Sequence, residues 1–336
     1  MKVFIVGGTG LLGSAAAVEL VARGHEVSGV ALGPVPEGAS LPPGASIEYR
    51  NHLEMSDGEI DAGLAGRDAL VFAAGVDERV EFPPPVYEKY LKYNVAPVRR
   101  FFSAARRLGL RKAVLLGSYF CDYARERPEL ELGRRHPYIR ARLDQEAAAM
   151  AHNGSGLDVI VLELPYIFGA QPGRKPVWVF LIKRLLAMKG PCFYTRGGTT
   201  MVTVRQVAQC VAGAIEGGRG GVCYPVGWYN MKWREMLAIM YRHLGQPRKL
   251  ILTVPDFMYT LVARRAGGDY RRRGIESGLD LERLVDIQTA ELFVDPAAIR
   301  DELGAREDDI EAAIGESVRQ SLEALKGRKL MGMRAE

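Results

Sequence analysis

The hydrophobic pattern of the first thirty residues predicts a strand, a helix and a second strand. Residues 2–6 (KVFIV) form a short β-branched run that ends in glycines, as a buried strand does. Residues 11–24 (LLGSAAAVELVARG) carry apolar side chains at helical spacing up to a final glycine, and residues 25–32 (HEVSGVAL) are again typical of a strand. The segment therefore predicts a βαβ unit.

The same alternation continues through the first half of the chain. Residues 69–75, 112–118 and 157–164 are near-continuous apolar runs, and residues 90–109 and 138–154 between them have the spacing of amphipathic helices. Strands that are apolar throughout are typical of a parallel sheet covered by helices on both faces. We therefore predict an α/β fold, a Rossmann-type doubly wound parallel sheet.

The regular alternation ends near Gly169. Further helices are predicted at residues 177–188, 202–218 and 230–245, whereas residues 250–278 have no clear period. Because ligands of open α/β sheets bind beyond the carboxyl ends of the strands, we expect the later part of the chain to close over that edge. We predict one Rossmann domain from residues 1–168 and 200–225 and a smaller C-terminal lobe from residues 169–199 and 226–336.

The composition is that of an ordinary globular protein. Hydrophobic residues make up 48% of the 336 positions and charged residues 25%, which fits neither a disordered nor a fibrous chain. The 45 basic residues mostly alternate with 40 acidic ones, so the net charge of +5 indicates a mixed surface and no nucleic-acid partner. One basic cluster, residues 263–274 (ARRAGGDYRRRG), fits either an exposed loop or a clamp for a phosphorylated ligand.

The cysteines and histidines predict neither disulfides nor a metal site. The four cysteines lack C-x-x-C spacing, and the histidines lack a metal-ligand spacing with carboxylates or cysteines, so we expect reduced thiols and no metal. The N-terminal apolar run is too short for a signal peptide, and no window approaches the roughly 20 apolar residues of a membrane helix. We therefore expect a cytoplasmic protein with no membrane partner.

A glycine motif follows the first strand. The segment VGGTGLLG places Gly7, Gly10 and Gly13 in G-x-x-G-x-x-G spacing between a strand and a helix. Such glycines permit a tight turn and a close backbone approach to a pyrophosphate, toward which the helix amides point. A merely flexible loop would explain neither the spacing nor the flanking elements. The motif predicts dinucleotide binding.

The glycine spacing resembles that of the short-chain dehydrogenase/reductase superfamily in its extended branch, also called the NAD-dependent epimerase/dehydratase family. Five further segments resemble landmarks of that family in the same order: residues 72–76 (FAAGV), 93–118, 163–169 (ELPYIFG), 201–216 and 293–304. The resemblance covers almost the whole chain. It implies cofactor contacts by Gly7, Thr9, Gly10, Leu11, Leu12, Gly13, Ala73, Ala74, Gly75, Asn94, Pro165 and Ile167.

The resemblance also implies NAD(P)-linked chemistry at a carbonyl or alcohol carbon, often of a nucleotide sugar. In the family a tyrosine is the general acid or base, a lysine four residues later lowers its pKa and binds the ribose, and a serine or threonine polarises the substrate oxygen. Tyr138 matches the tyrosine, but Arg142 stands at the lysine position. Arginine supplies the cation that a tyrosine with a pKa of about 10 needs, although it cannot relay a proton.

Two residues compete for the role of the polarising hydroxyl. Ser118 ends the strand 112–118 and is the only hydroxyl of the expected size, whereas aligning Tyr123 with the family's aromatic residue puts Tyr119 at that place. We take Ser118 as the first choice and leave Tyr119 open. The Asp-Glu pair of the family's sugar dehydratases is missing from this turn, which disfavours dehydration.

The end of the second strand normally decides the cofactor. Ala31 and Leu32 stand there, so the chain has neither the acid that binds the ribose of NAD nor an arginine for the 2′-phosphate of NADP. Because the missing carboxylate removes a repulsion toward that phosphate, we lean slightly to NADP. His52 fits a plain loop residue and an adenine contact equally well.

These observations predict an NAD(P)-dependent oxidoreductase or epimerase with a polar small-molecule substrate, nucleotide-linked if the arginines of residues 264–273 bind phosphate. Tyr138 is the expected acid/base, with Arg142 and Ser118 as its partners. A second hypothesis, motivated by Arg142, is an NAD(P)-binding sensor or structural protein with little or no turnover. A third is an enzyme for a lipid or polyketide carbonyl, if the apolar face of residues 177–188 lines the pocket. A homodimer is common among such enzymes.

Overall fold

A computed structural model describes residues 1–332, and a seven-stranded parallel sheet forms its centre. The strand order is β10-β6-β5-β4-β1-β2-β3. From β1 the chain adds β2 and β3 on one side, and from β4 it adds the later strands on the other side. Ligands of doubly wound sheets bind at this switch between β1 and β4. The doubly wound fold predicted from the sequence is confirmed. The strands are β1 (Lys2–Val6), β2 (Glu26–Ala31), β3 (Ala45–Tyr49), β4 (Ala69–Phe72), β5 (Lys112–Ser118), β6 (Asp158–Leu164) and β10 (Val222–Pro225).

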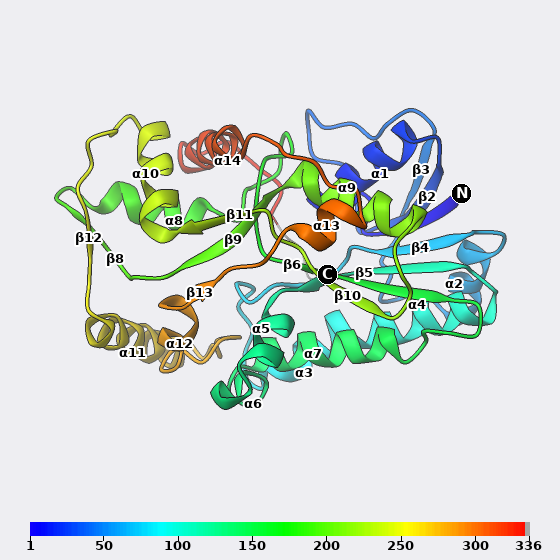
Figure 1. The fold of residues 1–336 in the computed structure, drawn as a ribbon, viewed down its shortest axis with the longest axis horizontal. Helices are drawn as coiled ribbons and strands as arrows, with labels where there is room; N and C mark the ends of the chain where they lie inside the picture. The colour runs from blue at the N-terminus through cyan, green and yellow to red at the C-terminus, as the bar shows by residue number, and fades with distance from the viewer. Residues whose placement is uncertain (333–336) are drawn as a thin grey trace.

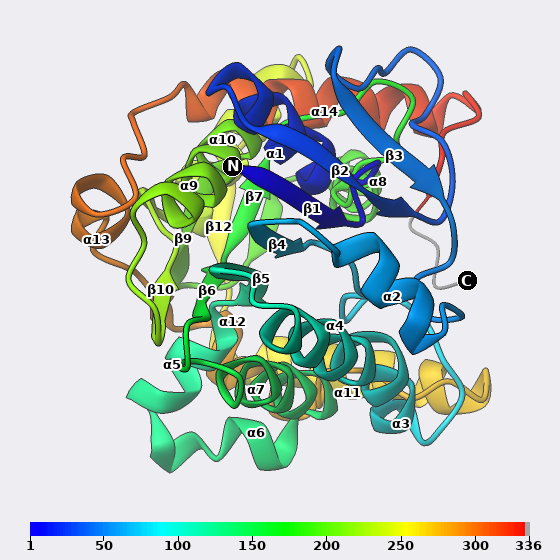
Figure 2. The same cartoon turned by 90° about the vertical axis from the view of Figure 1, so that its right-hand side faces the viewer.

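Helices cover both faces of this sheet (Figures 1 and 2). Each face of the sheet buries its own apolar core, because every strand sends alternate side chains to opposite sides. One face carries α1 (Leu11–Ala22), α9 (Val204–Glu216) and α13 (Ala297–Asp301), and the other α2 (Asp57–Leu64), α3 (Val86–Tyr90), α4 (Ala96–Arg107) and α7 (Pro137–Met150). The helix predicted at residues 90–109 is interrupted by a turn of π-helix, Leu91–Val95.

The second lobe lies beyond the carboxyl ends of the strands, at the left of Figure 1. Its apolar core gathers around Trp233 and Met240, which are 2% and 0% exposed. Its strands are β7 (Tyr166–Phe168), β9 (Gly198–Thr203), β11 (Tyr229–Lys232) and β13 (Glu291–Leu292) in one sheet and β8 (Cys192–Tyr194) and β12 (Ile251–Thr253) in another. Its helices are α8 (Val179–Ala187), α10 (Trp233–His243), α11 (Asp256–Arg272), α12 (Val285–Gln288) and α14 (Ile310–Leu325).

Between the two parts lie the short helices α5 (Phe120–Glu126) and α6 (Leu132–Arg135), joined by a 3₁₀ turn at Pro128–Leu130. Strand β3 and helices α2, α11 and α14 are among the elements that were not predicted from the pattern. Within residues 1–332, none of the helices has the length and apolar character needed to traverse a bilayer. The division of the chain into two domains at the predicted boundaries stays a prediction.

Candidate functional site

A cavity of about 440 Å³ opens at the carboxyl ends of β1, β4 and β5. It is lined by most of the residues that the sequence singled out, which come from five separate stretches of the chain. Gly13 and Asn94 do not line it. The predicted residues on its wall are Gly7, Thr9, Gly10, Leu11, Leu12, Ala73, Ala74, Gly75, Ser118, Tyr138, Arg142, Pro165 and Ile167.

The glycine-rich turn is packed too tightly for side chains. The amide of Gly10 donates a hydrogen bond to the carbonyl of Gly7 at 2.9 Å, which closes the turn before α1. A Cβ on Gly13 would stand 2.2 Å from the Gly7 oxygen, and Gly7 itself has a φ of +89°. Only glycine fits these two positions. The turn thus has the close backbone approach that a pyrophosphate requires.

Asn94 lies behind the cavity wall and holds the loop 73–76 by hydrogen bonds. Its side chain is fully buried, accepts a hydrogen bond from the amide of Val76 at 2.8 Å and donates one to the carbonyl of Val76 at 3.0 Å. Its own carbonyl accepts a bond from the Gln145 side chain of α7 at 2.9 Å. The π-helical turn around Asn94 therefore ties the loop 73–76 to the helix that carries Tyr138.

Tyr138 lies at the first turn of α7, between the two parts of the molecule. Its amide donates to the carbonyl of Gly278 at 2.8 Å, and the His136 ring accepts from the amide of Asp280 at 2.9 Å, so a second-lobe segment holds the start of this helix. The phenol ring is 5% exposed. Burial raises the pKa of Tyr138 above its usual range, the charge of Arg142 lowers it, and Glu78 raises it further.

Arg142 lies one turn beyond Tyr138 on the same face of α7. Its Nη2 donates to the carbonyl of Leu116 at 2.9 Å, and its guanidinium carbon lies 5.9 Å from the centre of the Tyr138 ring. The side chain is 8% exposed, and its Nε has no hydrogen-bond partner among the described residues. A buried N–H without a partner is costly, and Arg142 also lines the cavity, so its role toward a ligand stays a prediction.

Both candidates for the polarising hydroxyl line the cavity. Ser118 is 6% exposed and its Oγ accepts a long bond, 3.4 Å, from the amide of Phe120. The hydroxyl of Tyr119 accepts a bond from Thr199 Oγ1 at 3.2 Å. Burial raises the pKa of Tyr119, so this phenol stays protonated. Ser118 stays our predicted first choice for the polarising hydroxyl, and Tyr119 stays the alternative.

Three charged residues that sequence patterns did not single out also line the cavity. They are Asp77, Glu78 and Arg79, and Arg79 forms ion pairs with both acids. Burial raises the pKa of the Glu78 carboxyl, against the lowering effect of Arg79. The sequence does contain a signal for these residues. Three charged residues in a row follow the apolar segment 69–76, at the edge of the sheet where ligands bind.

The turn after β7 and helix α14 hold the glycine-rich turn in place. Gln171 donates to the carbonyl of Thr9 at 3.3 Å and Arg174 donates to the same oxygen at 2.8 Å. Gln171 is in turn bonded through its carbonyl to Gln320 of α14. The backbone of Gly169 exchanges two hydrogen bonds with the Ser317 hydroxyl. The C-terminal helix thereby supports the wall of the cavity.

The end of β2 contributes Ala31 and Leu32 to the cavity, with His52 nearby. His52 is 6% exposed, burial lowers its pKa to about 4, and its ring packs edge-on against Phe72 at 5.9 Å. Its imidazole is therefore neutral at physiological pH. The basic cluster of residues 263–274 lies mainly on α11, and none of its members lines this cavity. The cluster therefore forms part of the surface of α11, and it does not contact a ligand bound in this cavity.

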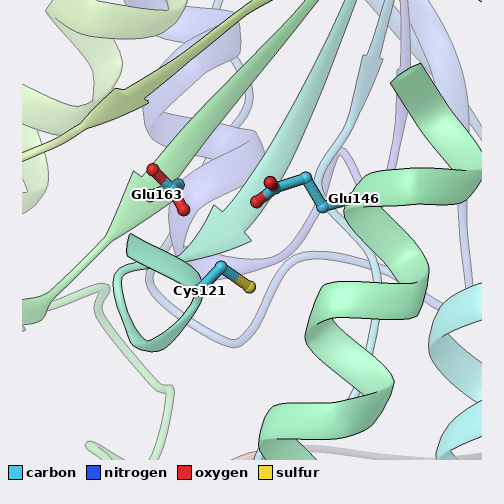
Figure 3. Close-up of side chains that lie close together, drawn as sticks. All are labelled: Cys121, Glu146 and Glu163. Carbon is cyan, nitrogen blue, oxygen red and sulfur yellow. The ribbon is translucent and has the colours of Figure 1, made fainter. Parts of the chain in front are cut away.

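A buried acidic group lies behind the site (Figure 3). Cys121, Glu146 and Glu163 bring their ligand atoms within 4.8 Å of one another, the geometry of a potential metal site. The guanidinium of Arg125, however, contacts both carboxylates at 2.6 Å. One oxygen of each carboxylate has no partner among the described residues. Asp122 also lies 3.8 Å from Arg125, so three carboxylates share one arginine. The excess of negative charge favours a proton held between Glu146 and Glu163.

Glu163→Gln is expected to flatten the pH dependence of stability. Burial, and next the charge of Glu146, raises the pKa of Glu163 to about 8. The folded state therefore keeps a proton that the unfolded chain loses above the ordinary pKa of 4.5, so the contribution of Glu163 to stability is greatest at low pH and falls as the pH rises toward 8. The slope due to one proton is about 1.4 kcal/mol per pH unit. Urea unfolding at half-unit pH intervals measures it.

The exposed Glu282→Gln variant is the matched control and should reproduce the wild-type slope between pH 5 and 8. If the wild-type protein and Glu163→Gln showed the same slope, the shared proton would have no place in this cluster. Our expectation that the protein holds no metal stays a prediction.

The comparisons with known proteins agree with this architecture. The structure named gox2253 has a TM-score of 0.74 at 21% identity, over 98% of this chain and 99% of that chain. A UDP-glucuronic acid 4-epimerase from Bacillus cereus, in complex with NAD, has a TM-score of 0.67 at 12% identity over 96% and 99%. A UDP-N-acetylglucosamine 4-epimerase from Methanobrevibacter ruminantium M1, in complex with UDP-N-acetylmuramic acid, has 0.65 at 15% over 96% and 98%.

A search of curated proteins finds no match. The model of the NAD dependent epimerase/dehydratase family matches residues 3–224, which contain the glycine-rich turn, the Tyr138 helix and the whole central sheet. This match covers about two thirds of the chain, and the resemblance inferred from the glycine spacing and the five landmarks is confirmed. The chain belongs to the NAD dependent epimerase/dehydratase family.

Proposed function

We propose that the protein is an NAD-dependent epimerase or oxidoreductase that acts on a carbonyl or alcohol carbon of a nucleotide sugar. One observation carries the proposal: Tyr138 and Arg142 lie on one buried helix face in the same cavity as the glycine-rich turn. The nucleotide-sugar enzymes among the structural neighbours support this substrate class.

The cavity suits a dinucleotide. The glycine-rich turn accepts a pyrophosphate against its backbone, and Arg174, which lines the cavity next to Thr9, would supply a cation there. NAD is favoured because five of the structural neighbours are NAD complexes and because no arginine lies at Ala31 or Leu32 to hold a 2′-phosphate. The slight lean to NADP drawn from the sequence finds no support in these neighbours.

Tyr138, Ser118 and Arg142 have separate roles in the proposed reaction. A bound nicotinamide would supply or accept the hydride. Tyr138, whose pKa is raised by burial, holds its proton at neutral pH and can donate it to a carbonyl oxygen, while Ser118 polarises that oxygen. For the reverse step, the fixed charge of Arg142 stabilises the tyrosinate that forms when Tyr138 takes a proton from a hydroxyl.

The test is a titration followed by a substrate panel. The purified protein is titrated with NADH and NADPH by fluorescence and then incubated with UDP-sugars and simple ketones while product formation is followed. We expect tighter binding of NADH and conversion of at least one UDP-sugar. Tighter binding of NADPH would overturn the cofactor assignment, and conversion of ketones alone the substrate class.

A second candidate is an NAD-binding sensor or structural protein without turnover. It is favoured by Arg142, whose guanidinium bonds the Leu116 carbonyl in place of the family's more mobile lysine. Cofactor binding with no conversion of any compound in the panel would support it. A lipid or polyketide carbonyl is the third, since Trp178 and Phe180 bring the apolar face of α8 to the cavity wall.

Arg142→Lys is expected to keep cofactor affinity within about threefold, because a positive charge remains in place. Its turnover should change, since a compact ammonium loses the bond to Leu116 but can relay a proton. Steady-state kinetics across the pH range measure this, with Arg142→Gln as the neutral comparison. Equal rates for all three proteins would show that position 142 does not act on Tyr138 or on the ribose.

A further inference from the structure

Most of the large apolar side chains on the surface belong to the second lobe. Of the thirteen that are exposed in residues 1–332, nine lie between residues 180 and 262. Single exposed apolar residues are normal on a protein surface, but a group of this size calls for a covering partner. The nine are Phe180, Leu186, Phe193, Leu250, Leu252, Phe257, Met258, Leu261 and Val262.

Most of these side chains come from neighbouring elements. Phe193 of β8 and Leu252 of β12 are directly paired across the two-stranded sheet, and β12 leads through Pro255 into α11. Figure 1 shows β8, β12 and α11 along one side of the lobe. In α11 the exposed residues 257, 258, 261 and 262 recur at the spacing of one helix face, and Phe257 is 73% exposed. We call this surface, β8, β12 and α11, the apolar edge.

The same helix face continues into arginines. Arg264, Arg265, Arg271 and Arg272 are all exposed in the second half of α11. Residues 246–274 contain seven arginines and lysines against two aspartates, an excess of five positive charges that equals the formal net charge of the whole chain. Among the described residues, only two arginines of the cluster have a carboxylate partner, Arg272 with Asp269 and Arg273 with Glu81.

Apolar side chains followed by unpaired arginines match the two layers of an anionic membrane surface. Acyl chains receive the apolar residues, and the lipid phosphates receive the guanidinium groups. A second copy of this chain fits less well as the partner. In a two-fold dimer the positively charged apolar edges of the two copies would face and repel each other. We propose that the apolar edge docks on an anionic lipid bilayer, with Phe257, Met258, Leu261 and Val262 inserted below the phosphates.

Helix α8, which precedes β8 in the chain, contributes to the cavity wall. Phe180 is 56% exposed and also lines the cavity. The charge of Arg184, one helical turn later in α8, lowers the pKa of Tyr259 in α11, which burial raises. This docking does not depend on the reaction proposed above, and it revises the expectation of no membrane partner.

The test is sedimentation of the full-length protein with vesicles, either of phosphatidylcholine alone or of phosphatidylcholine with 30% phosphatidylglycerol. We expect binding to the anionic vesicles only. The double variant Phe257→Ser/Leu261→Ser should weaken it at least about tenfold, and so should Arg264→Glu/Arg265→Glu. These side chains are exposed, so the fold should persist, which a thermal melt checks.

Two matched controls separate docking from general attraction by a basic protein. Val18→Ser/Leu108→Ser removes two exposed apolar side chains from the other domain, and Arg106→Glu/Arg107→Glu makes the same charge change there. Both should bind like the wild type. Absence of binding to anionic vesicles, or equal losses in the test and control variants, would overturn the proposal. A vesicle-independent dimer that Phe257→Ser/Leu261→Ser dissociates, with no vesicle binding, would assign the apolar edge to a second copy instead.

Discussion

Tyr138→Phe is expected to lower turnover by about 10²–10⁴-fold, the usual contribution of a positioned acid/base. The hydroxyl is lost, but the ring stays packed between Tyr90 and Phe120, at 5.4 and 6.4 Å between ring centres. Cofactor affinity and unfolding temperature should therefore change little. Steady-state kinetics on the converted UDP-sugar and a fluorescence titration with NADH measure the two quantities separately.

Tyr90→Phe is the matched control. Its hydroxyl is buried without a hydrogen-bond partner among the described residues and lies beside the Tyr138 ring, but Tyr90 does not line the cavity. Removing an unsatisfied hydroxyl should leave turnover intact and leave stability equal or slightly higher. A Tyr138→Phe enzyme as fast as Tyr90→Phe would remove Tyr138 from the mechanism.

Gly13→Ala is expected to abolish cofactor binding and to destabilise the protein by about 1–3 kcal/mol. The new Cβ would stand 2.2 Å from the carbonyl oxygen and 2.9 Å from the carbonyl carbon of Gly7. These are backbone atoms of the turn that receives the pyrophosphate, so relief of the clash must open the turn itself. Urea unfolding and NADH titration measure the two effects.

Gly58→Ala is the control for the glycine substitution. Gly58 lies in α2, and a Cβ added there would have no atom within 4 Å. Alanine is a better helix former than glycine, so we expect unchanged cofactor binding and a gain of about 0.5–1 kcal/mol. If Gly13→Ala bound NADH as tightly as Gly58→Ala, the close packing of the turn against α1 would be wrong.

The central sheet and the cofactor turn were predictable because their signals are local. Residues 2–32 contain a complete βαβ pattern, and the spacing of Gly7, Gly10 and Gly13 is read within seven positions. Asn94 was found only through the family resemblance. Its role depends on a π-helical turn and on the distant Gln145, which no local pattern encodes.

The second lobe was harder because its elements contradict the periodicity rule. Residues 250–278 showed no clear period, and α11 explains why: one exposed face carries apolar residues in its first half and arginines in its second. Because this face changes from apolar to charged halfway along the helix, no single 3.6-residue hydrophobic period runs through the segment. The phosphate clamp suggested by its arginines was wrong for this cavity, because α11 lies outside the cavity wall.

Parts of the site depend on contacts between distant residues. The start of the Tyr138 helix is fixed by Gly278 and Asp280, more than a hundred residues later. Similarly, Arg125 neutralises part of the charge of Glu146 and Glu163 only because α5 folds over the ends of the sheet. Spacing within a segment carries no information about such pairings.

The contacts of Gln171 also set an order of assembly during protein synthesis. The glycine-rich turn leaves the ribosome first, but Gln171 and Arg174, which hold the Thr9 carbonyl, follow much later. Helix α14, whose Gln320 bonds Gln171, follows later still. A growing chain can thus form the first strands of the central sheet early, whereas the support of its glycine-rich turn is complete only after α14 has emerged. We therefore expect the dinucleotide to be retained only once α14 has folded against Gln171.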